Sequence, residues 1–367
     1  MKFTCDRNSI LKEISIAQDI ISTRNTLSIL SNVLIEANGN ILTIRATDLK
    51  VGFETTIAVE VDVPGRTTVF CDKFLGILRS LPEDTIEFEL QDQRLDIRPL
   101  LKKIDFQLKC IEVDKFPELK DVSQDQYFEI PQKDLIDMIN QTIFAVSDDE
   151  TRFFMNGVFL ENLDGSIIMV ATDGRRLSFI SRKIGDKISD FEGVIIPPKI
   201  LNLLRRLCPG EGNLFIAVSD KNIFVKFGTV KLSSNLIEGQ FPKYDRVIPE
   251  SQDFELVVKK EELLNALSRV SLLVEQKSRR IFVTVNENNV LLHSEESEIG
   301  IAREEIACKY EGPEISLALN YVFLIEPLKV IDEESVSIRF TDSKKAISVV
   351  PTEEKDYVHI IAPMQLD

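Results

Sequence analysis

The alternation of hydrophobic and polar residues is clearest near the middle of the chain. Phe128 and Ile130 alternate with polar neighbours, as in a half-buried strand. Apolar residues then recur three and four positions apart between Leu135 and Ile143, which predicts a helix with one apolar face. Two strand-forming segments follow, the first at 152–161, and the second ends at a Thr-Asp-Gly turn signal. The pattern therefore predicts strand, helix, strand, strand.

The same pattern recurs along the chain. Phe128 lies 125 positions after Phe3, and the same shift places Ile139 on Ile14. A weaker third copy places Leu256 on Phe3. One shift that holds over a whole segment indicates an internal repeat, which decides the architecture. We predict three tandem repeats of ordinary domain size, at residues 1–122, 126–248 and 252–367.

Each predicted repeat holds two helices and roughly six to eight short strands. In repeat one, Cys71-Asp72 is expected to cap a second helix that stops at Pro82. In repeat three, Pro327 is expected to kink or end the second helix. Because each helix has one apolar side, both should pack on one face of an antiparallel sheet, which gives an α+β fold.

Composition limits the class of protein. The chain has 60 acidic and 44 basic residues, and its net charge of −16 disfavours general adhesion to nucleic acid without excluding a local basic surface. Its five cysteines include no CxxC pair, which is typical of reduced thiols. The chain start has no apolar signal core, and no apolar run approaches the roughly 20 residues of a membrane helix. We expect a soluble cytoplasmic protein.

Signals for catalysis are sparse. The two histidines, His293 and His359, lack metal-ligand spacing and are expected to be ordinary side chains. Asp173 follows Thr172 at a turn, and Thr47-Asp48 occupies the same place one repeat earlier, so a structural role explains both. The acidic cluster 148–150 is expected to be a solvated loop rather than a metal site. We expect no catalytic residue, no metal and no cofactor.

Positive charges recur at matching helix positions. Lys73 and Arg79 in repeat one match Lys199 and Arg205 in repeat two. If the helices line one concave side, these cations would face phosphates and hold a nucleic-acid backbone without reading its sequence. Ordinary exposed helix charges are the alternative explanation.

Together these features resemble the bacterial beta sliding clamp family, the processivity subunits of the replicative DNA polymerase. The resemblance spans the chain, and its most specific segments are Met1-Lys-Phe-Thr, Val170-Ala-Thr-Asp-Gly-Arg-Arg-Leu, Gly239-Gln-Phe-Pro-Lys-Tyr-Asp-Arg-Val-Ile-Pro and Pro363-Met-Gln-Leu. It implies three repeats of the DNA-clamp fold and a head-to-tail homodimer. Six domains would then close a ring around duplex DNA, with helices inside and sheets outside.

The resemblance also implies a function. The chain would be a non-catalytic clamp that encircles DNA without sequence specificity, is loaded by an ATP-driven clamp loader, and tethers the polymerase catalytic subunit and other replication and repair proteins. These partners would bind through short peptides in a pocket between repeats two and three. By position, that pocket comprises Met155, Thr172, Gly174, Arg175, Arg176, Leu177, Pro242, Arg246, Val247, Asn320, Ile360, Pro363 and Met364.

Three positions of the pocket depart from well-known members. Arg175 stands where they carry histidine, Met155 where some carry leucine, and Ala346 where some carry serine. These departures bear on which peptides the pocket prefers. The expected apolar slot consists of Leu177, Pro242, Val247, Ile360 and Met364.

The resemblance assigns two further surfaces. With the repeated helix cations, the expected DNA contacts are Arg24, Lys73, Arg79, Arg152, Lys199 and Arg205. The expected dimer interface pairs an alternating strand at 103–109 with repeat three of the partner, through Ile104, Phe106, Leu108, Leu272 and Leu273. Lysines 102, 103 and 109 would meet glutamates 298, 304 or 305 across it. Alternatively, the leucines belong to a core.

Two other functions are compatible with the sequence. The first is a repeat scaffold that binds proteins but not DNA. The second is a hydrolase that uses Asp148, Asp149 or Asp173, although no catalytic motif accompanies these residues.

Overall fold

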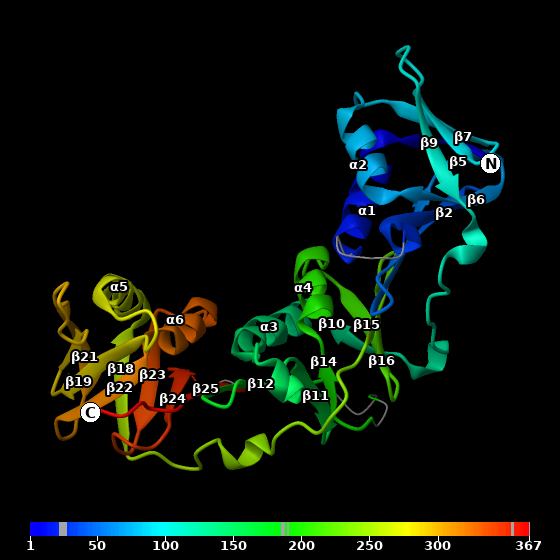
Figure 1. Ribbon diagram of the computed structural model, residues 1–367. Coiled ribbons are helices and arrows are strands. Elements are labelled where there is room, and N and C mark those ends of the chain that lie inside the picture. Colours follow the sequence, from blue (N-terminus) through cyan, green and yellow to red (C-terminus); the bar gives the residue numbers. More distant parts are fainter. Residues whose placement is uncertain (22–27, 185–187, 189–190, 354–355, 367) are drawn as a thin grey trace. The chain divides into compact units, whose positions relative to one another are not determined.

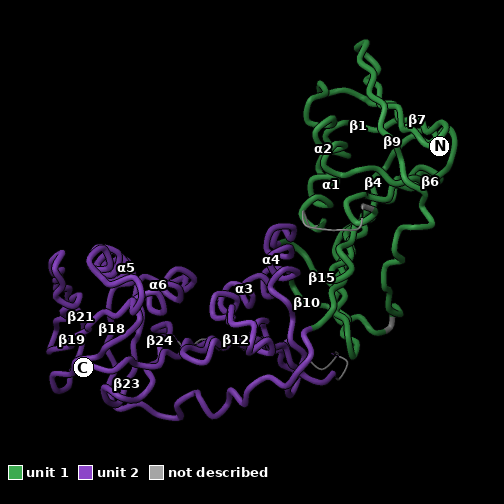
Figure 2. The backbone as a smooth tube through the Cα atoms, in the orientation of Figure 1, with its two compact units in different colours: residues 1–131, 211–236 green, residues 132–210, 237–367 purple. Residues whose placement is uncertain are grey.

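The computed structural model describes residues 1–21, 28–184, 188, 191–353 and 356–366. It forms two compact units, which Figure 2 distinguishes by colour. Unit 1 comprises Met1–Pro131 and Glu211–Leu236, and unit 2 comprises Gln132–Gly210 and Ile237–Asp367. Each unit is built on one antiparallel sheet, of 13 strands in unit 1 and 12 in unit 2.

Within the described residues, the α-helices are α1 Arg7–Ile20, α2 Cys71–Ser80, α3 Gln132–Thr142, α4 Pro198–Leu207, α5 Lys260–Val270 and α6 Tyr321–Val330. Within each repeat the two helices contact each other, α1 with α2, α3 with α4, and α5 with α6 (Figure 1), and α3 also contacts α6 of the next repeat. The first helix of each pair packs on the hairpin of its own repeat, so the expectation of helices on one face of antiparallel strands is confirmed.

The strands of repeat one are β1 Lys2–Asp6, β2 Asn32–Asn38, β3 Ile41–Thr47, β4 Val51–Ala58, β5 Glu60–Val63, β6 Gly65–Phe70, β7 Thr85–Gln91, β8 Arg94–Pro99 and β9 Phe106–Ile111. Those of repeat two are β10 Phe128–Pro131, β11 Val158–Leu163, β12 Ser166–Thr172, β13 Arg176–Lys183, β14 Val194–Ile196, β15 Asn213–Val218, β16 Asn222–Phe227 and β17 Val230–Asn235. Those of repeat three are β18 Phe254–Lys259, β19 Arg280–Asn286, β20 Asn289–His293, β21 Arg303–Tyr310, β22 Ile315–Asn320, β23 Ser335–Phe340, β24 Ile347–Pro351 and β25 Tyr357–Ile361.

Every repeat uses the same two sets of four strands. One set runs β1-β7-β8-β9. It recurs as β10-β15-β16-β17 and as β18-β23-β24-β25, where each set is read from its first strand in the sequence to its last. The other set runs β6-β2-β3-β4, and it recurs as β14-β11-β12-β13 and β22-β19-β20-β21. Repeat one adds β5 beside β1, so its described residues form nine strands, more than the expected six to eight.

The joints between repeats are strand pairs. The last strand of repeat two, β17, pairs with β4 of repeat one, and the last strand of repeat three, β25, pairs with β13 of repeat two. In both cases the earlier repeat supplies the strand that follows its Thr-Asp turn. We call these pairs the first junction, which lies in unit 1, and the second junction, which lies in unit 2.

The repeated apolar positions form the core. Phe3 and Ile14 are fully buried, as are their counterparts to within a few per cent: Phe128, Ile139, Leu256 and Leu267. Burial of one such side chain stabilises the fold by roughly 1.5–3 kcal/mol, so the repeated spacing marks the positions that hold each repeat together. All five cysteines are free, and burial raises the pKa of Cys5, Cys71 and Cys208 to about 12.

Two strand predictions are wrong at their starts. Residues 152–157 do not begin a strand, because Glu150–Met155 is a 3₁₀ helix that Asp149 caps by accepting a hydrogen bond from the Thr151 backbone N–H at 2.9 Å. Such a local side-chain bond favours a turn over a strand. Ile104 also precedes its strand, since β9 begins at Phe106.

Two helix ends also differ from expectation. The N-cap of α2 is Phe70 and not Cys71-Asp72, and Cys71 is instead a fully buried first-turn residue. Pro327 does not end α6, which continues to Val330. Both Pro327 and Leu328 are buried, so packing compensates for the backbone bond that proline removes. Among the described residues, no helix is both long enough and apolar enough to cross a membrane.

Candidate functional site

The Thr172-Asp173-Gly174 turn joins β12 to β13 and orders the edge of a pocket. The Thr172 hydroxyl accepts a hydrogen bond from the Gly174 N–H and donates to the Arg176 carbonyl, at 3.0 and 2.6 Å. The Asp173 carboxylate accepts from the backbone N–H groups of Arg175 and Arg176. Gly174 has a φ of +87°, a conformation that glycine adopts without strain.

The counterpart turn in repeat one has the same bonds. The Thr47 hydroxyl accepts from the Leu49 N–H and donates to the Val51 carbonyl, and Asp48 accepts from Lys50 and Val51. The expectation that Asp173 is a turn residue is therefore confirmed. The hydrolase hypothesis loses its strongest candidate, because the Asp173 carboxylate is already held by two backbone donors and by Arg176.

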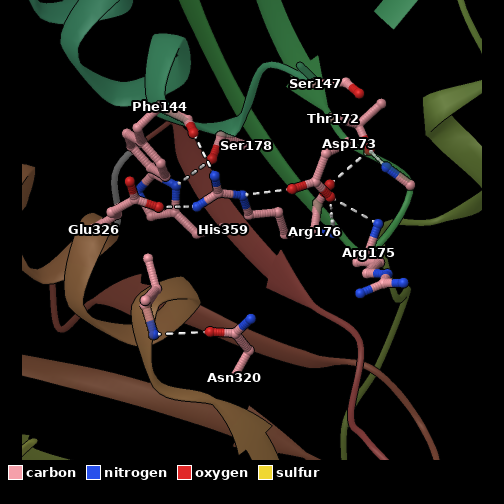
Figure 3. A network of polar contacts seen from close by, with 12 residues as sticks. Phe144, Ser147, Thr172, Asp173, Arg175, Arg176, Ser178, Asn320, Glu326 and His359 are labelled. Atoms are coloured by element: carbon pink, nitrogen blue, oxygen red, sulfur yellow. Dashed lines mark hydrogen bonds and ion pairs between the residues drawn. The ribbon is translucent and has the colours of Figure 1, made fainter. Parts of the chain in front are cut away.

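Arg176 connects β13 to α6 (Figure 3). Its guanidinium donates to Asp173 at 3.0 Å, to Glu326, and to the Phe144 carbonyl at 2.5 Å, and it lies over the Phe323 ring at 4.5 Å. Only 11% of the side chain is exposed. The Arg176 guanidinium thus bonds to groups within the protein. Its role at the site is to hold the neighbouring residues in position rather than to bind a ligand itself.

His359 lies next to this ion pair and is fully buried. It forms hydrogen bonds with the Ser178 hydroxyl through Nδ1 and with the Gln141 side-chain oxygen through Nε2, at 3.0 and 3.1 Å. Gln141 in turn donates to the Val330 carbonyl. Burial lowers the pKa of His359 to about 3, so the ring is neutral at physiological pH. The chain of bonds, of which Figure 3 shows the bond between His359 and Ser178, fixes α3, α6, β13 and β25 against one another.

A small apolar cavity of about 160 Å³ opens beside the turn. Its wall comprises Met155, Thr172, Gly174, Arg175, Arg176, Leu177, Pro242, Tyr244, Val247, Ala346, Ile360 and Ala362. Leu177 and Ile360 face each other across the second junction and form its floor. A cavity of this size and lining suits one or two apolar side chains.

A second cavity, of about 400 Å³, lies on the other side of Arg175. Its wall comprises Arg175, Arg280, Asn320, Phe323, Ala362, Pro363, Met364 and Gln365. Asn320 also caps α6 by accepting from the Val322 N–H at 3.0 Å. Met364 lines the larger cavity and not the smaller one that Leu177 lines, so its place in one apolar slot with Leu177 stays a prediction.

Two further predicted residues lie at the margin. Arg152 donates to Asp149 at 2.9 Å, and its Nη1 lies where a Cβ on Gly174 would be only 2.8 Å away. Arg246 is exposed and lines neither cavity. Twelve of the thirteen predicted pocket residues thus line one cavity or the other, with Arg246 outside; Asn320, Pro363 and Met364 belong to the larger one and Arg175 to both.

The sequence reasoning missed Tyr244, which packs against Phe159 and Phe179 and donates to Glu161. Burial, together with Glu161, raises the pKa of Tyr244. Tyr244 lies inside the Gly239 motif, so the motif itself was the signal for it. Gln365 likewise lies inside the Pro363-Met-Gln-Leu segment, whereas Arg280, Phe323 and Ala362 carried no such signal, because only the fold brings them beside Arg175.

The predicted DNA contacts are exposed charges on helices. Lys73 and Arg79 lie on the exposed side of α2, and Arg205 on that of α4, while Lys199 is half-buried. The buried positions of the two helices match at a shift of 126, so these cations occupy equivalent faces. Arg24 lies outside the described residues.

The predicted interface residues lie on an incompletely paired strand. Phe106 and Leu108 alternate with exposed neighbours along β9, which pairs with β8 over Phe106–Lys109 and with β6 only at Cys110 and Ile111. In repeat three, Leu272 is 79% exposed, so it is no core residue, and Leu273 is half-buried beside it. Glu304 is bonded to Arg269 of its own chain at 2.8 Å.

The acidic cluster at 148–150 leads from a loop into a 3₁₀ helix, with Asp148 and Glu150 exposed and Asp149 as the N-cap, so the expected solvated loop is confirmed in part. Asp149 is held by Thr151 and Arg152, which keep its pKa below its usual range. Within the described ranges, no group of three or more His, Cys, Asp and Glu residues is placed to hold a metal ion.

Comparison with known proteins places the chain in a family. Family models match all three repeats: the N-terminal domain of the DNA polymerase III beta subunit over residues 1–120, its central domain over 129–243 and its C-terminal domain over 245–365. The beta sliding clamp of Treponema pallidum is 47% identical and that of Escherichia coli 30% identical, each over all of both chains.

Solved structures agree with the sequences. The DNA polymerase sliding clamp of Bacillus subtilis superposes with a TM-score of 0.95 at 26% identity, and the DNA polymerase III subunit beta of Pseudomonas aeruginosa with 0.93 at 30% identity, again over all of both chains. The chain thus belongs to the beta sliding clamp family, the processivity clamps of DNA polymerase III.

Proposed function

We propose that the chain is a non-catalytic clamp that forms a head-to-tail homodimer around duplex DNA and tethers polymerase and repair proteins through the two cavities of unit 2. The proposal includes three clamp domains, at residues 1–122, 126–248 and 252–367, a cytoplasmic location, and loading by an ATP-driven loader. One observation carries the dimer: the two junctions within the chain follow a pairing rule that leaves part of one strand's edge free in repeat one and part of another's free in repeat three.

The rule concerns which strands pair. At each junction the strand after the Thr-Asp turn of one repeat pairs antiparallel with the last strand of the next repeat. In repeat three the strand at this position is β21, and in repeat one the last strand is β9. β21 pairs with β20 along Arg303–Ala307 and with β18 only from Cys308 to Tyr310. The free stretches of β21 and β9 therefore match, and a second copy of the chain satisfies both.

Side chains near these strands suit such a pair. Phe106 and Leu108 give β9 an apolar stripe, and the exposed Leu272 offers an apolar contact in repeat three. At the first junction, Lys231 and Glu54 form an ion pair of 2.8 Å across the strands. Lys109 and Glu305 are exposed on β9 and β21 and can repeat that pairing. A head-to-tail contact that closes after two copies makes a ring of six repeats.

A closed ring explains how an acidic protein holds DNA. Exposed helix cations such as Lys73, Arg79 and Arg205 contact phosphates without sequence preference. Their grip is weak against a net charge of −16, so retention depends on closure of the ring and not on affinity. Sliding follows, because no base-specific bond must break.

The two cavities supply the tether. Their apolar walls provide affinity and their polar rim fixes the direction of a bound peptide. Related clamps support this use of the fold: a Pseudomonas aeruginosa sliding clamp is bound to griselimycin, and a C. crescentus clamp holds PEG at a putative beta-motif tethering region.

The experiment measures mass in solution and retention on DNA. By light scattering, the chain should have twice its 41.7 kDa mass, and after loading onto nicked circular DNA it should stay bound until the circle is cut. The Leu272→Asp variant should lower both the mass and the retention, because a carboxylate replaces an apolar contact. Leu163→Asp, at a leucine that is 53% exposed, is the control and should change neither.

A monomer in all conditions, or equal retention on circular and linear DNA, would contradict the ring. A chain that captures the polymerase peptide but leaves circular DNA freely would instead support the protein scaffold that does not bind DNA.

A further inference from the structure

Residues that correspond between repeats one and three can be found by counting from the turns. Arg45 is the fifth residue of β3, which follows a two-residue turn, and it lies opposite Glu54 of β4. His293 is the fifth residue of β20, which also follows a two-residue turn, and it lies opposite Arg303 of β21. Arg303 therefore holds the place in repeat three that Glu54 holds in repeat one.

The last strands of repeats one and two correspond in the same way. The first residue of β8 lies opposite Lys109 of β9, and the first residue of β16 lies opposite Asn235 of β17. Both β8 and β16 follow a two-residue turn. The residues four positions before Lys109 and Asn235 are Asp105 and Lys231, so Asp105 holds the place in repeat one that Lys231 holds in repeat two.

These places face each other at the junctions within the chain. At the first junction Lys231 and Glu54 lie directly opposite each other, and their side chains form an ion pair of 2.8 Å. At the second junction the residue 125 positions after Glu54 is Phe179, and it lies opposite Val358. Directly opposite side chains are close neighbours on one face of a sheet, and each junction matches them, charge with opposite charge or apolar with apolar.

The same alignment sets Asp105, the residue before β9, opposite Arg303 when β9 and β21 come from different copies of the chain. We propose that Asp105 of one copy pairs with Arg303 of a second copy, and that this pair fixes the register of the joined strands and selects which chains can join; the inference rests on the proposed head-to-tail dimer. Both side chains are available, since Asp105 is 64% exposed and Arg303 is exposed as well. Relative to Lys231 and Glu54, the two signs are exchanged between the strands.

The first junction shows how a carboxylate at this position can serve two cations. Glu54 accepts from Arg45 of its own repeat at 2.7 Å and from Lys231 of the next repeat at 2.8 Å. Asp105 already accepts from Arg98 of its own chain at 2.8 Å, which orients the carboxylate and leaves lone pairs for a second donor. A guanidinium from the second copy supplies that donor, and its bond to a carboxylate is stronger than a neutral hydrogen bond.

The experiment exchanges the two charges separately and then combines the variants. Asp105→Arg and Arg303→Asp should each raise the dissociation constant of the dimer roughly 100-fold in analytical ultracentrifugation, because like charges then face each other at both interfaces of the ring. An equimolar mixture of the two variants should return the constant to within about threefold of the unchanged chain, since the mixed dimer has opposite charges at both interfaces. Native mass spectrometry with a tag on one variant should show the mixed dimer as the main species.

Controls separate the pair from general effects of charge and from unfolding. Asp220→Arg reverses an exposed carboxylate at the β15–β16 turn of the same unit, and the dissociation constant should not change. Asp105→Arg mixed with the unchanged chain should dimerise less tightly than the mixture of the two variants, because one interface still opposes two arginines. Each variant should keep the circular dichroism spectrum of the unchanged chain, which shows that loss of the bond to Arg98 has not unfolded repeat one.

The outcomes distinguish the register from the ring. If the unchanged chain dimerises and both variants dimerise as tightly, the register is overturned while the ring stands. If the variants separate into monomers but their mixture does not recover, Asp105 and Arg303 act within their own chains, and the pair is overturned. If the unchanged chain is a monomer, the ring itself is wrong, and the register falls with it.

Discussion

The first and second junctions have the same antiparallel strand pairing but different side chains, which are charged at the first and apolar at the second. At the first, Glu54 on β4 accepts from Arg45 at 2.7 Å and from Lys231 at 2.8 Å, and Arg45 also meets Glu36 at 3.1 Å. At the second, the positions 125 residues after Arg45 and Glu54 are Val170 and Phe179. Val170 is fully buried in the apolar cluster of that junction, and Phe179 packs against it.

The spaces beside the two junctions differ accordingly. A cavity of about 570 Å³ adjoins the first junction, but charged residues such as Arg45, Glu54 and Lys231 line it and satisfy one another. Leu119 packs over Gly52 there, since a Cβ on Gly52 would lie 3.2 Å from the leucine side chain. At the second junction Leu177 replaces Gly52, and the wall is apolar.

Strand pairing therefore holds the repeats together at both junctions, whereas the side chains determine which junction suits an apolar ligand. A network whose charges already have partners gains little from a guest, whereas an apolar wall gains by excluding water. The larger cavity, beside the first junction, is therefore less suited to an apolar ligand than the smaller cavity beside the second junction.

The largest effect is expected from a charge placed at the second junction. Val247 lines the small cavity and is 49% exposed, so Val247→Asp should fold and yet weaken binding of a polymerase peptide by roughly 100-fold, because a carboxylate beside an apolar side chain loses its water. The control is Val122→Asp, at the valine 125 residues earlier in the sequence, which should change affinity less than about twofold. Equal losses in anisotropy titrations would break the distinction between the junctions.

A smaller effect concerns a buried acid beside the first junction. Glu13 on α1 is 7% exposed, and burial raises its pKa against the opposing bond from Thr55. In repeat two the corresponding residues are the apolar Met138 and Ile180. Because the folded-state pKa of Glu13 is raised, its contribution to stability is present below the unfolded pKa and is lost as pH rises through the folded pKa.

Glu13→Gln should remove this loss. In urea titrations from pH 4 to 8, the free energy of unfolding of the variant should exceed that of the unchanged chain by about 1–2 kcal/mol at pH 8 and should equal it at pH 4. A difference that is constant with pH would show that Glu13 does not titrate in this range.

The smallest effect is expected from the charged network itself. Burial opposes the ionised form of Glu54, but Lys231 and Arg45 outweigh it and lower the Glu54 pKa. The contribution of Glu54 to the stability of the fold is therefore present above its pKa in the unfolded chain, and it is lost as the pH falls through its pKa in the folded chain. Glu54→Gln should cost about 1 kcal/mol at pH 7, seen as faster amide exchange in β4. Glu83→Gln, at an exposed glutamate of the same unit, should leave exchange unchanged.

Much of the fold could be predicted because it repeats. A shift of 125 residues aligned Phe3 with Phe128 and the two Thr-Asp turns, and the structure places these residues equivalently. The errors fell where local chemistry or packing prevailed over pattern. Asp149 turned an apparent strand into a 3₁₀ helix, and the buried Pro327 did not stop α6.

By itself the sequence determined the three repeats, their helices and most residues of the site, because periodic burial and turn formation depend on the spacing of residues that are close in the sequence. Only the tertiary structure decided that Arg176 is bonded to Glu326, that Met364 and Leu177 line different cavities, and that Arg175 lines both cavities. These facts depend on contacts between residues 150 or more positions apart, such as Arg176 with Glu326, and no local pattern encodes which partner a charge will meet.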